Sequence, residues 1–197
     1  PTIIAAESGK HILVEVPFAA TLKECDRMIA AAEKSGVNLM YAQSDRYKPA
    51  NMAAKTLIDS GEIGNIIWMT HTQLSNGAPP PSQNGPPKKS DWAGSPESKR
   101  WNLWKKSGGG ILTYVVPHAT DIYRWFANSD FDIVYSVGMG RYVSDGDGED
   151  NDIGGFKFKN GVFAAMLDGK SNPGASIDEW RIVGTKGMIE IKVPQNR

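Results

Sequence analysis

Hydrophobic positions in the first part of the chain follow a strand–helix–strand pattern. Residues 1–8 have the pattern of a helix end, and the apolar run His11–Val16 predicts a buried strand. A capping-box pair that begins at Thr21 predicts a helix with one apolar stripe. Residues 38–42 predict a second strand. Two strands joined through a helix by short links predict a βαβ unit, whose strands are parallel.

The remaining chain alternates between helical and strand periodicity. Apolar residues recur at helical spacing over residues 49–61 and again over Ile111–Phe126, where Pro117 should kink or restart the helix. Residues 65–74 predict a strand of mixed pattern. Later runs, two pairs of which flank glycine-containing turns, predict antiparallel strands. These runs are residues 131–143, 153–158, 162–168, 180–183 and 188–193. The predicted fold class is therefore α/β followed by α+β.

Residues 75–110 differ in composition from the rest of the chain. They hold six of its 12 prolines and six of its 21 glycines. They also hold Trp92, Trp101 and Trp104, which are half of the six tryptophans. Disordered segments are poor in aromatic residues, so this composition favours an ordered arm or lid over a free linker.

Charge and cysteine content narrow the functional class. The chain of 197 residues carries 22 basic and 22 acidic residues, so its formal net charge is zero. Nucleic acids and anionic membranes require a basic surface, so neither is expected as a partner. A single cysteine, Cys25, rules out an internal disulfide framework and fits a reducing compartment, for which we predict the cytoplasm.

One helical row carries the best candidates for chemistry. Tyr114, His118, Asp121 and Trp125 are spaced four, three and four residues apart, which places them on one side of a continuous helix. An imidazole exchanges protons near neutral pH, so His118 is a candidate general acid or base that Asp121 could orient. The alternative is a satisfied histidine at the edge of a core helix.

Other polar positions remain open to two interpretations. Glu15 lies near the end of a predicted parallel strand, where α/β folds bind ligands, but it could equally be a paired rim residue. The next peptide bond, Val16–Pro17, is a possible cis bond. His71 is expected to be structural.

Two further motifs carry weaker signals. The run Gly108–Gly110 could cradle an anion or act as a hinge for the preceding segment. The acidic run Asp145–Asp152 lacks the pattern of a calcium loop and predicts a solvated connection. No metal site is predicted.

Four segments together resemble the Gfo/Idh/MocA oxidoreductases. The family's "GKHVLVEKP" segment is similar to Gly9–Pro17, and its "R…P…LIDSG-IG" helix is similar to residues 46–64. Its "GGG…D-x-G-x-H-x-x-D" helix is similar to residues 108–121, and its "EDN…NG…GTKG" sheet to residues 149–187. Order and spacing agree over nearly the whole chain.

The resemblance implies an amino-terminal Rossmann domain that binds NAD or NADP. It also implies a second domain with a mostly antiparallel sheet and helices packed on one face, which binds a sugar, cyclitol or related polyol. That sheet commonly forms the interface of a homo-oligomer. The resemblance assigns His118 to catalysis, Glu15, Pro17 and Arg46 to the cofactor, and Asp121 to the substrate. Tyr114 is a candidate substitute acid in catalysis. Trp101 is a candidate substrate contact, because a tryptophan here could stack on a sugar face or else fill a subunit interface.

The resemblance also implies that the chain is an interior fragment of a longer protein. Residues 1–46 correspond only to the last part of the Rossmann domain, and residues 47–197 to the substrate and dimerisation domain. The glycine-rich G-x-G-x-x-G turn is not in the sequence. We therefore expect NAD or NADP to act in the intact parent and no coenzyme to bind tightly to this chain alone.

Two substitutions set this chain apart from the family pattern. The family's proton-transferring lysine, between Glu15 and Pro17, is Val16, and its aspartate four residues before the histidine is Tyr114. Valine carries neither a proton nor a charge, so the usual mechanism is in doubt. The alternative function is a non-catalytic ligand-binding and dimerisation module descended from the family.

Overall fold

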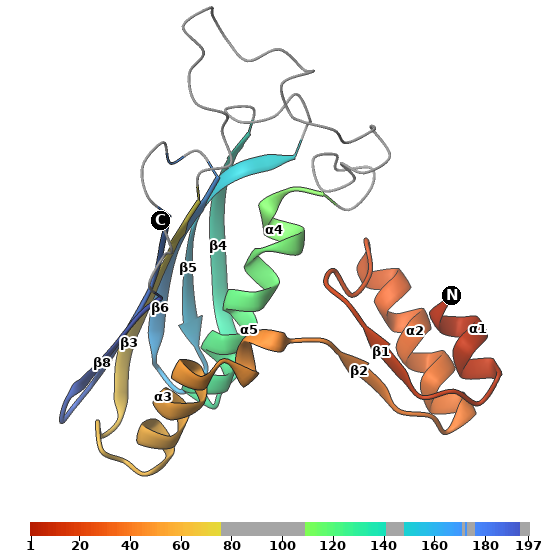
Figure 1. The fold of residues 1–197 in the computed structure, drawn as a ribbon, viewed down its shortest axis with the longest axis horizontal. Coiled ribbons are helices and arrows are strands. Elements are labelled where there is room, and N and C mark those ends of the chain that lie inside the picture. Colours follow the sequence, from red (N-terminus) through yellow and green to blue (C-terminus); the bar gives the residue numbers. More distant parts are fainter. Residues whose placement is uncertain (76–108, 141–147, 171, 173–175, 194–197) are drawn as a thin grey trace, which may run out of the picture. The chain divides into compact units, whose positions relative to one another are not determined.

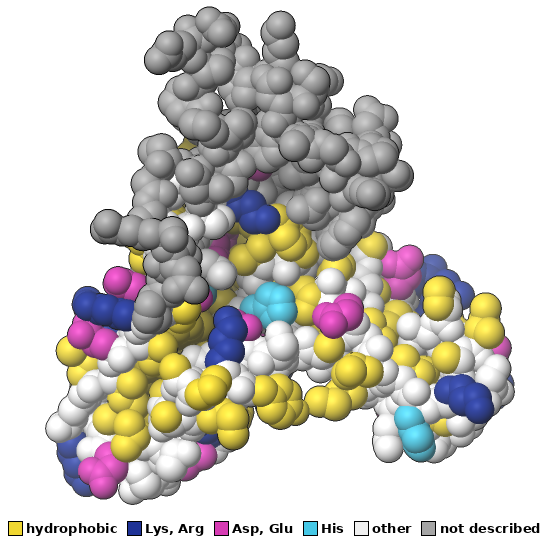
Figure 2. Space-filling view, viewed as in Figure 1, with side chains coloured by type: hydrophobic (Ala, Val, Ile, Leu, Met, Phe, Trp, Pro, Cys, Tyr) yellow, Lys and Arg dark blue, Asp and Glu magenta, His cyan; other side chains and the backbone are white. Residues whose placement is uncertain are grey.

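The computed structural model describes residues 1–75, 109–140, 148–170, 172 and 176–193. The chain divides into two compact units, residues 1–44 and 45–197. The predicted arm at residues 75–110 falls almost entirely outside the described residues. Figure 2 shows acidic and basic side chains interspersed with hydrophobic ones, in keeping with the zero net charge.

The first unit confirms the predicted βαβ pattern. Strands β1 (Ile12–Val14) and β2 (Leu39–Tyr41) pair in parallel, joined through helix α2 (Leu22–Ser35), and helix α1 (Thr2–Glu7) precedes them. The capping box at the start of α2 is present, because the Thr21 hydroxyl accepts from the Glu24 N–H and the Glu24 carboxylate accepts from the Thr21 N–H. The Val16–Pro17 bond is cis, as the sequence suggested.

The prediction of a buried strand over His11–Val16 was wrong in two respects. Strand β1 spans only three residues, and its burial alternates rather than being continuous. Leu13 is 65% exposed and Met40, its partner on β2, is 49% exposed. The physical reason is that a strand presents successive side chains to opposite faces, and these two side chains share the solvent-facing one.

The second unit is a six-stranded sheet with helices on one face (Figure 1). The strands follow the order β4-β5-β6-β3-β7-β8, and only β3 and β6 pair in parallel. The bounds are β3 (Ile66–Leu74), β4 (Phe131–Gly140), β5 (Glu149–Phe158), β6 (Phe163–Gly169), β7 (Ile177–Gly184) and β8 (Met188–Lys192). The mostly antiparallel sheet was therefore predicted correctly.

The helices of this unit are η1 (Ser44–Tyr47), α3 (Pro49–Asp59), α4 (Ile111–Tyr114) and α5 (Val116–Ala127). Pro117 lies in the first turn of α5 and separates it from α4. A proline cannot donate the interior helical hydrogen bond, but its missing N–H costs nothing in a first turn. The predicted restart of the helix at Pro117 is confirmed.

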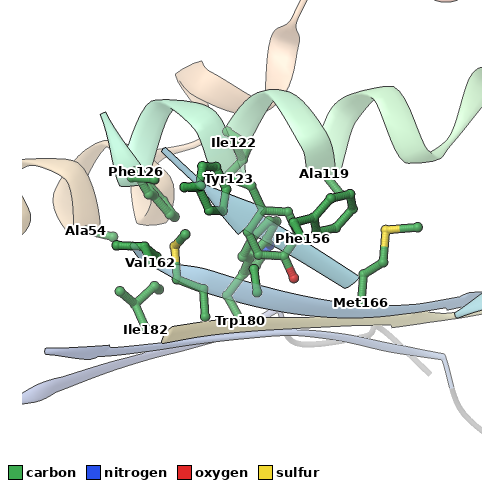
Figure 3. Close-up of a cluster of buried hydrophobic side chains, with 14 of the residues drawn as sticks. Ala54, Ala119, Ile122, Tyr123, Phe126, Phe156, Val162, Met166, Trp180 and Ile182 are labelled. Carbon is green, nitrogen blue, oxygen red and sulfur yellow. The ribbon is translucent and has the colours of Figure 1, made fainter. Parts of the chain in front are cut away.

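The core lies between α5 and the sheet. In Figure 3, Ile122, Tyr123 and Phe126 on the helix point toward Phe156 and Trp180 on the strands. All five are at least 94% buried. Burial of large apolar side chains contributes roughly 1.5–3 kcal/mol each, so this contact fixes α5 on the sheet. The amino end of α5 is thereby held over the sheet.

The acidic run was partly misassigned. Residues 141–147 lie outside the described residues, but Glu149–Asp152 form the start of β5 rather than a solvated connection. Asp150 and Asp152 are 4% and 1% exposed. Alternation along the strand places both on the same face as Phe156, so pairing within the sheet outweighed the polar character of these residues.

Within the described residues, no helix is long and apolar enough to cross a membrane.

Candidate active site

The helical row predicted from the sequence is divided at the break between α4 and α5. Tyr114 ends α4, Val115 lies between the helices, and His118 follows in the first turn of α5. The His118 N–H donates to the Val115 carbonyl at 3.0 Å. Its ring atom Nδ1 is buried and has no hydrogen-bond partner. His118 therefore retains a ring nitrogen with hydrogen-bonding capacity that the fold does not use.

The second half of the row is held by Arg46. The guanidinium donates to both carboxylate oxygens of Asp121, at 2.6 and 2.7 Å. It also lies over the ring of Trp125, 5.7 Å from the centroid. The hydrogen bond to Asp121 raises the pKa of Arg46. This bidentate pair joins η1 to α5, and both residues belong to the second unit.

Tyr114 contacts a residue that the sequence did not single out. Lys170 Nζ makes a short hydrogen bond to the Tyr114 hydroxyl and lies 4.3 Å from the centre of its ring. Lys170 follows β6 directly, and its N–H donates to the Asp150 carbonyl at 2.9 Å. The contact brings an ammonium group to the end of the helical row.

A polar row crosses four strands of the sheet. Asp152 on β5 pairs with Asp168 on β6, Asp168 with Gln73 on β3, and Gln73 with Asp178 on β7. Residues two apart in a strand share a face, so Asp168 lies on the same face as the core residue Met166. The row therefore lies on the face of the sheet that carries the core residues.

Two carboxylates of this row are unusually poorly satisfied. Asp168 is 1% exposed, and neither carboxylate oxygen has a hydrogen-bond partner. Asp152, equally buried, accepts from the Ser136 hydroxyl through one oxygen, while the other has no partner. Burial raises the pKa of Asp152. Burial also raises the pKa of Asp168 to about 6, with the nearby charge of His71 opposing the shift and that of Asp152 adding to it.

His71 lies on β3 two residues before Gln73, on the same face of the sheet as the row. Its Nε2 lies 3.2 Å from Asp178 Oδ1, and its ring stacks on Trp180 with centroids 4.0 Å apart. Burial tends to raise the pKa of Asp178, but the hydrogen bond and charge of His71 outweigh it, so the pKa is lowered. The expectation of a structural His71 is consistent with this packing, although His71 Nδ1 is buried without a partner.

The predicted site residues are distributed unevenly. Arg46 and Asp121 are brought together, but as an ion pair with each other. Glu15 and Pro17 lie in the first unit, at the end of β1, with Glu15 exposed. Trp101 lies outside the described residues. The predicted roles of these residues stay predictions.

Sequence reasoning missed Lys170, Asp152 and Asp168. The sequence did carry a signal for Asp168. Every second residue of β6 faces the core, and the other two at these positions, Ala164 and Met166, are apolar. A charged residue at a core position is unusual and marks a candidate site. Lys170 carried no comparable signal, since its role follows from a contact across 56 residues.

Gly110 has a packing requirement at the start of α4. Its φ is +98°, and a Cβ there would overlap Glu149 Oε2. The last glycine of the run Gly108–Gly110 therefore lies beside a carboxylate oxygen, which is itself an anion.

Comparison with known proteins places both units in one family. Residues 51–190 match the GFO/IDH/MocA C-terminal domain, and residues 1–43 match an oxidoreductase family with an NAD-binding Rossmann fold. Together the two matches account for most of the chain.

Curated relatives include two enzymes of sugar and cyclitol chemistry. The 1,5-anhydro-D-fructose reductase of Ensifer adhaerens is 29% identical over 195 residues, which are 95% of this chain and 51% of that protein. The scyllo-inositol 2-dehydrogenase (NAD(+)) of Bacillus subtilis is 27% identical over 195 residues, which are 96% of this chain and 50% of that protein. The chain thus spans about half the length of these relatives.

A solved structure has the same fold. Levoglucosan dehydrogenase, in a complex with NADH and levoglucosan, superposes with a TM-score of 0.79 at 26% identity. The similarity covers 97% of this chain and 50% of that one.

The residues that match the NAD-binding fold do not fit a whole dinucleotide. Residues 1–43 contain glycine only at positions 9 and 36, so the G-x-G-x-x-G turn is not among them. That turn brings backbone N–H groups to the pyrophosphate. The first unit supplies two parallel strands and their connecting helix, without that phosphate-binding turn.

Proposed function

Since this chain belongs to the Gfo/Idh/MocA oxidoreductase family, we propose that it is part of an NAD(P)-dependent oxidoreductase acting on a sugar-, cyclitol- or polyol-like substrate. The reaction class is interconversion of a carbinol and a carbonyl, with the nicotinamide of the whole protein exchanging hydride. The observation that carries the proposal is the unsatisfied His118 Nδ1 at the start of a helix with the family's pattern.

His118 is the group that exchanges the substrate proton in this proposal. Taking the proton from a carbinol oxygen, and returning it in the reverse direction, requires a ring nitrogen whose hydrogen-bonding capacity the fold does not use, and Nδ1 meets that requirement. The core contacts of α5 hold the imidazole in place, because Ala119 and Ile122 on the same helix are buried against the sheet. Positioning of this kind reduces the entropy lost on reaching the reactive geometry.

Tyr114 and Lys170 form the second part of the proposed site. Val16 removes the proton-carrying group that the family places beside Pro17. Tyr114 offers a hydroxyl that can donate or accept a hydrogen bond at the substrate oxygen, and Lys170 fixes its position. Asp121 contributes indirectly, since its bond to Arg46 anchors the middle of α5.

A non-catalytic binding and dimerisation module is the second candidate, and Val16 is the observation that favours it. In that case the polar groups would bind a ligand without transferring a proton. The two candidates are distinguished by turnover, which only the oxidoreductase would show.

The test is a substrate screen on the complete gene product. The absorbance of reduced nicotinamide is followed with NAD⁺ and with NADP⁺ against a panel of cyclitols, aldoses and anhydrosugars. Reduction that depends on one of these compounds supports the enzyme. Saturable binding of a polyol without reduction of either coenzyme would favour the module instead.

A further inference from the structure

The pair Asp152 and Asp168 is a buried carboxylate site without a cation. The two residues face each other across β5 and β6, and both are 1% exposed. Among the described residues, no lysine, arginine or histidine forms an ion pair with either one. Like charges at directly opposite positions destabilise a sheet, and a buried unpaired charge costs still more. A bound cation would relieve both costs.

In the described part of the chain, no surrounding group forms an ion pair with either carboxylate, although His71 lies near enough for its charge to act on Asp168. On the helix side, Tyr123 on α5 faces Asp168, but its hydroxyl donates to the Ala165 carbonyl. Glu149 on β5 adds a further negative charge near Asp152. On the sheet side, His71 is directed through Nε2 to Asp178, and Ser136 donates only one neutral hydroxyl to Asp152. The main-chain carbonyl of Asp150 accepts from the Lys170 N–H. Three buried oxygens, two of Asp168 and one of Asp152, remain without donors.

His71 provides an independent indication of a ligand. Its ring is 5% exposed, and the Nδ1 atom is buried without a partner. A buried polar atom left without a hydrogen bond costs roughly 1–3 kcal/mol, so native folds rarely retain several of them together. Here the unpartnered atoms come from three adjacent strands, and all three residues lie on the helix-covered face of the sheet.

The position of the pair connects it to the proposed active site. Asp168 lies two residues before Lys170, and the Lys170 side chain reaches Tyr114 on α4. Strand β6 ends at Gly169, so Lys170 is the first residue after the strand that carries Asp168. The carboxylate pair and the Tyr114–Lys170 contact are therefore close along the chain at one end of β6.

We propose that Asp152 and Asp168 bind an ammonium group of the substrate, so that the preferred substrate is an amino-substituted polyol. The identification of this ligand as a substrate rests on the proposed function. The proposed ammonium-binding site itself rests only on the carboxylate pair. An ammonium offers three donors, which matches the three unpartnered oxygens of the pair. A hydroxyl group offers one donor and leaves the negative charge uncompensated.

The test compares two ring compounds that differ in one substituent. Binding of scyllo-inosamine and of scyllo-inositol to this chain is measured by calorimetry without coenzyme. We expect the amine to bind about tenfold or more tightly, because hydrogen bonds to charged groups are stronger than those between neutral groups. Asp168→Asn and Asp152→Asn should each abolish the preference. Glu179→Gln, an exposed carboxylate on the same sheet, should retain it.

A pH series on the unmodified chain keeps the proposal testable if a variant does not fold. Protonation of Asp168, whose pKa is about 6, removes the charge that attracts the amine. Amine binding should therefore weaken as the pH falls through that value, more steeply than binding of the neutral polyol. The neutral polyol is the reference at each pH, because His71, Asp178, Tyr123 and Glu149 also face the carboxylate pair.

Equal affinities for the two compounds, failure of the amine to bind, or a preference retained in Asp168→Asn would overturn the inference. These outcomes are distinct from failure of the proposed function. Oxidation of neutral polyols without an amine preference refutes only the inference, whereas amine-selective binding without turnover refutes only the enzyme.

Discussion

At the residue scale, the main feature is the contrast between two aspartates in one unit. Asp168 is buried without a partner, and burial raises its pKa to about 6. Asp130 is exposed beside Arg124, whose hydrogen bond lowers the Asp130 pKa. The same side chain thus has opposite linkage to folding at the two positions.

The raised pKa of Asp168 predicts a specific pH dependence of stability. Between the ordinary value of 3.8 and about 6, the folded chain holds a proton that the unfolded chain has lost. This contribution to the free energy of unfolding therefore decreases as the pH rises through that window, by roughly 3 kcal/mol in total. Urea unfolding across this pH range should show that Asp168→Asn lacks the decrease and is more stable than the unmodified chain near neutral pH.

The control for this experiment is Asp130→Asn. The pKa of Asp130 is lowered, so its contribution to the free energy of unfolding has the opposite pH dependence. The Asp130→Asn variant should therefore keep the decrease that Asp168 causes. An Asp168→Asn variant with an unchanged stability profile would contradict the assignment.

At the element scale, the sequence predicted the helices and strands well, but it did not predict the side-chain contacts between them. The capping box at Thr21 and the break at Pro117 are local signals, because each depends on residues within one turn. The contact of Lys170 with Tyr114 depends instead on how β6 lies against α4. Asp152 was predicted to lie in a solvated connection but belongs to β5. The composition of an acidic run does not reveal that β6 pairs with this part of the chain.

The start of α4 offers a test of local geometry. Gly110 combines a left-handed φ with close approach of the Glu149 carboxylate, whereas Gly161 has φ +91° with nothing within 4 Å. Backbone strain at a left-handed φ costs about 1–3 kcal/mol for alanine at either position, and only Gly110→Ala adds an overlap with Glu149. Gly110→Ala should therefore lower the free energy of unfolding more than Gly161→Ala does, as measured by urea unfolding. Equal losses would show that the contact with Glu149 is relieved at no cost.

At the scale of the whole molecule, the face of the second unit opposite the helices carries an apolar surface on three of its strands. Its exposed hydrophobic residues lie on β4, β5 and β6, at alternate positions directed away from α5: Ile133, Tyr135, Val137, Met139, Ile153, Phe163 and Leu167. An apolar surface of this kind marks an interaction site, and we propose that a second copy of the chain covers it.

The proposed self-association predicts a change in mass. Val137 is 70% exposed on that face, so Val137→Lys should place a charge in the interface and shift the chain to the monomer in light scattering. Leu22→Lys, at an 84% exposed position in the first unit, is the matched control and should leave the mass unchanged. A monomeric unmodified chain at all concentrations would refute the proposal.

The whole account depends most on the role of His118, and kinetics of the complete gene product test it directly. We expect His118→Ala to lower kcat for the substrate found in the screen by about 10²–10⁴-fold, the usual contribution of a general acid or base. His11→Ala, which removes an exposed imidazole in the first unit, should leave kcat unchanged. Full turnover in the folded His118→Ala variant would contradict the account.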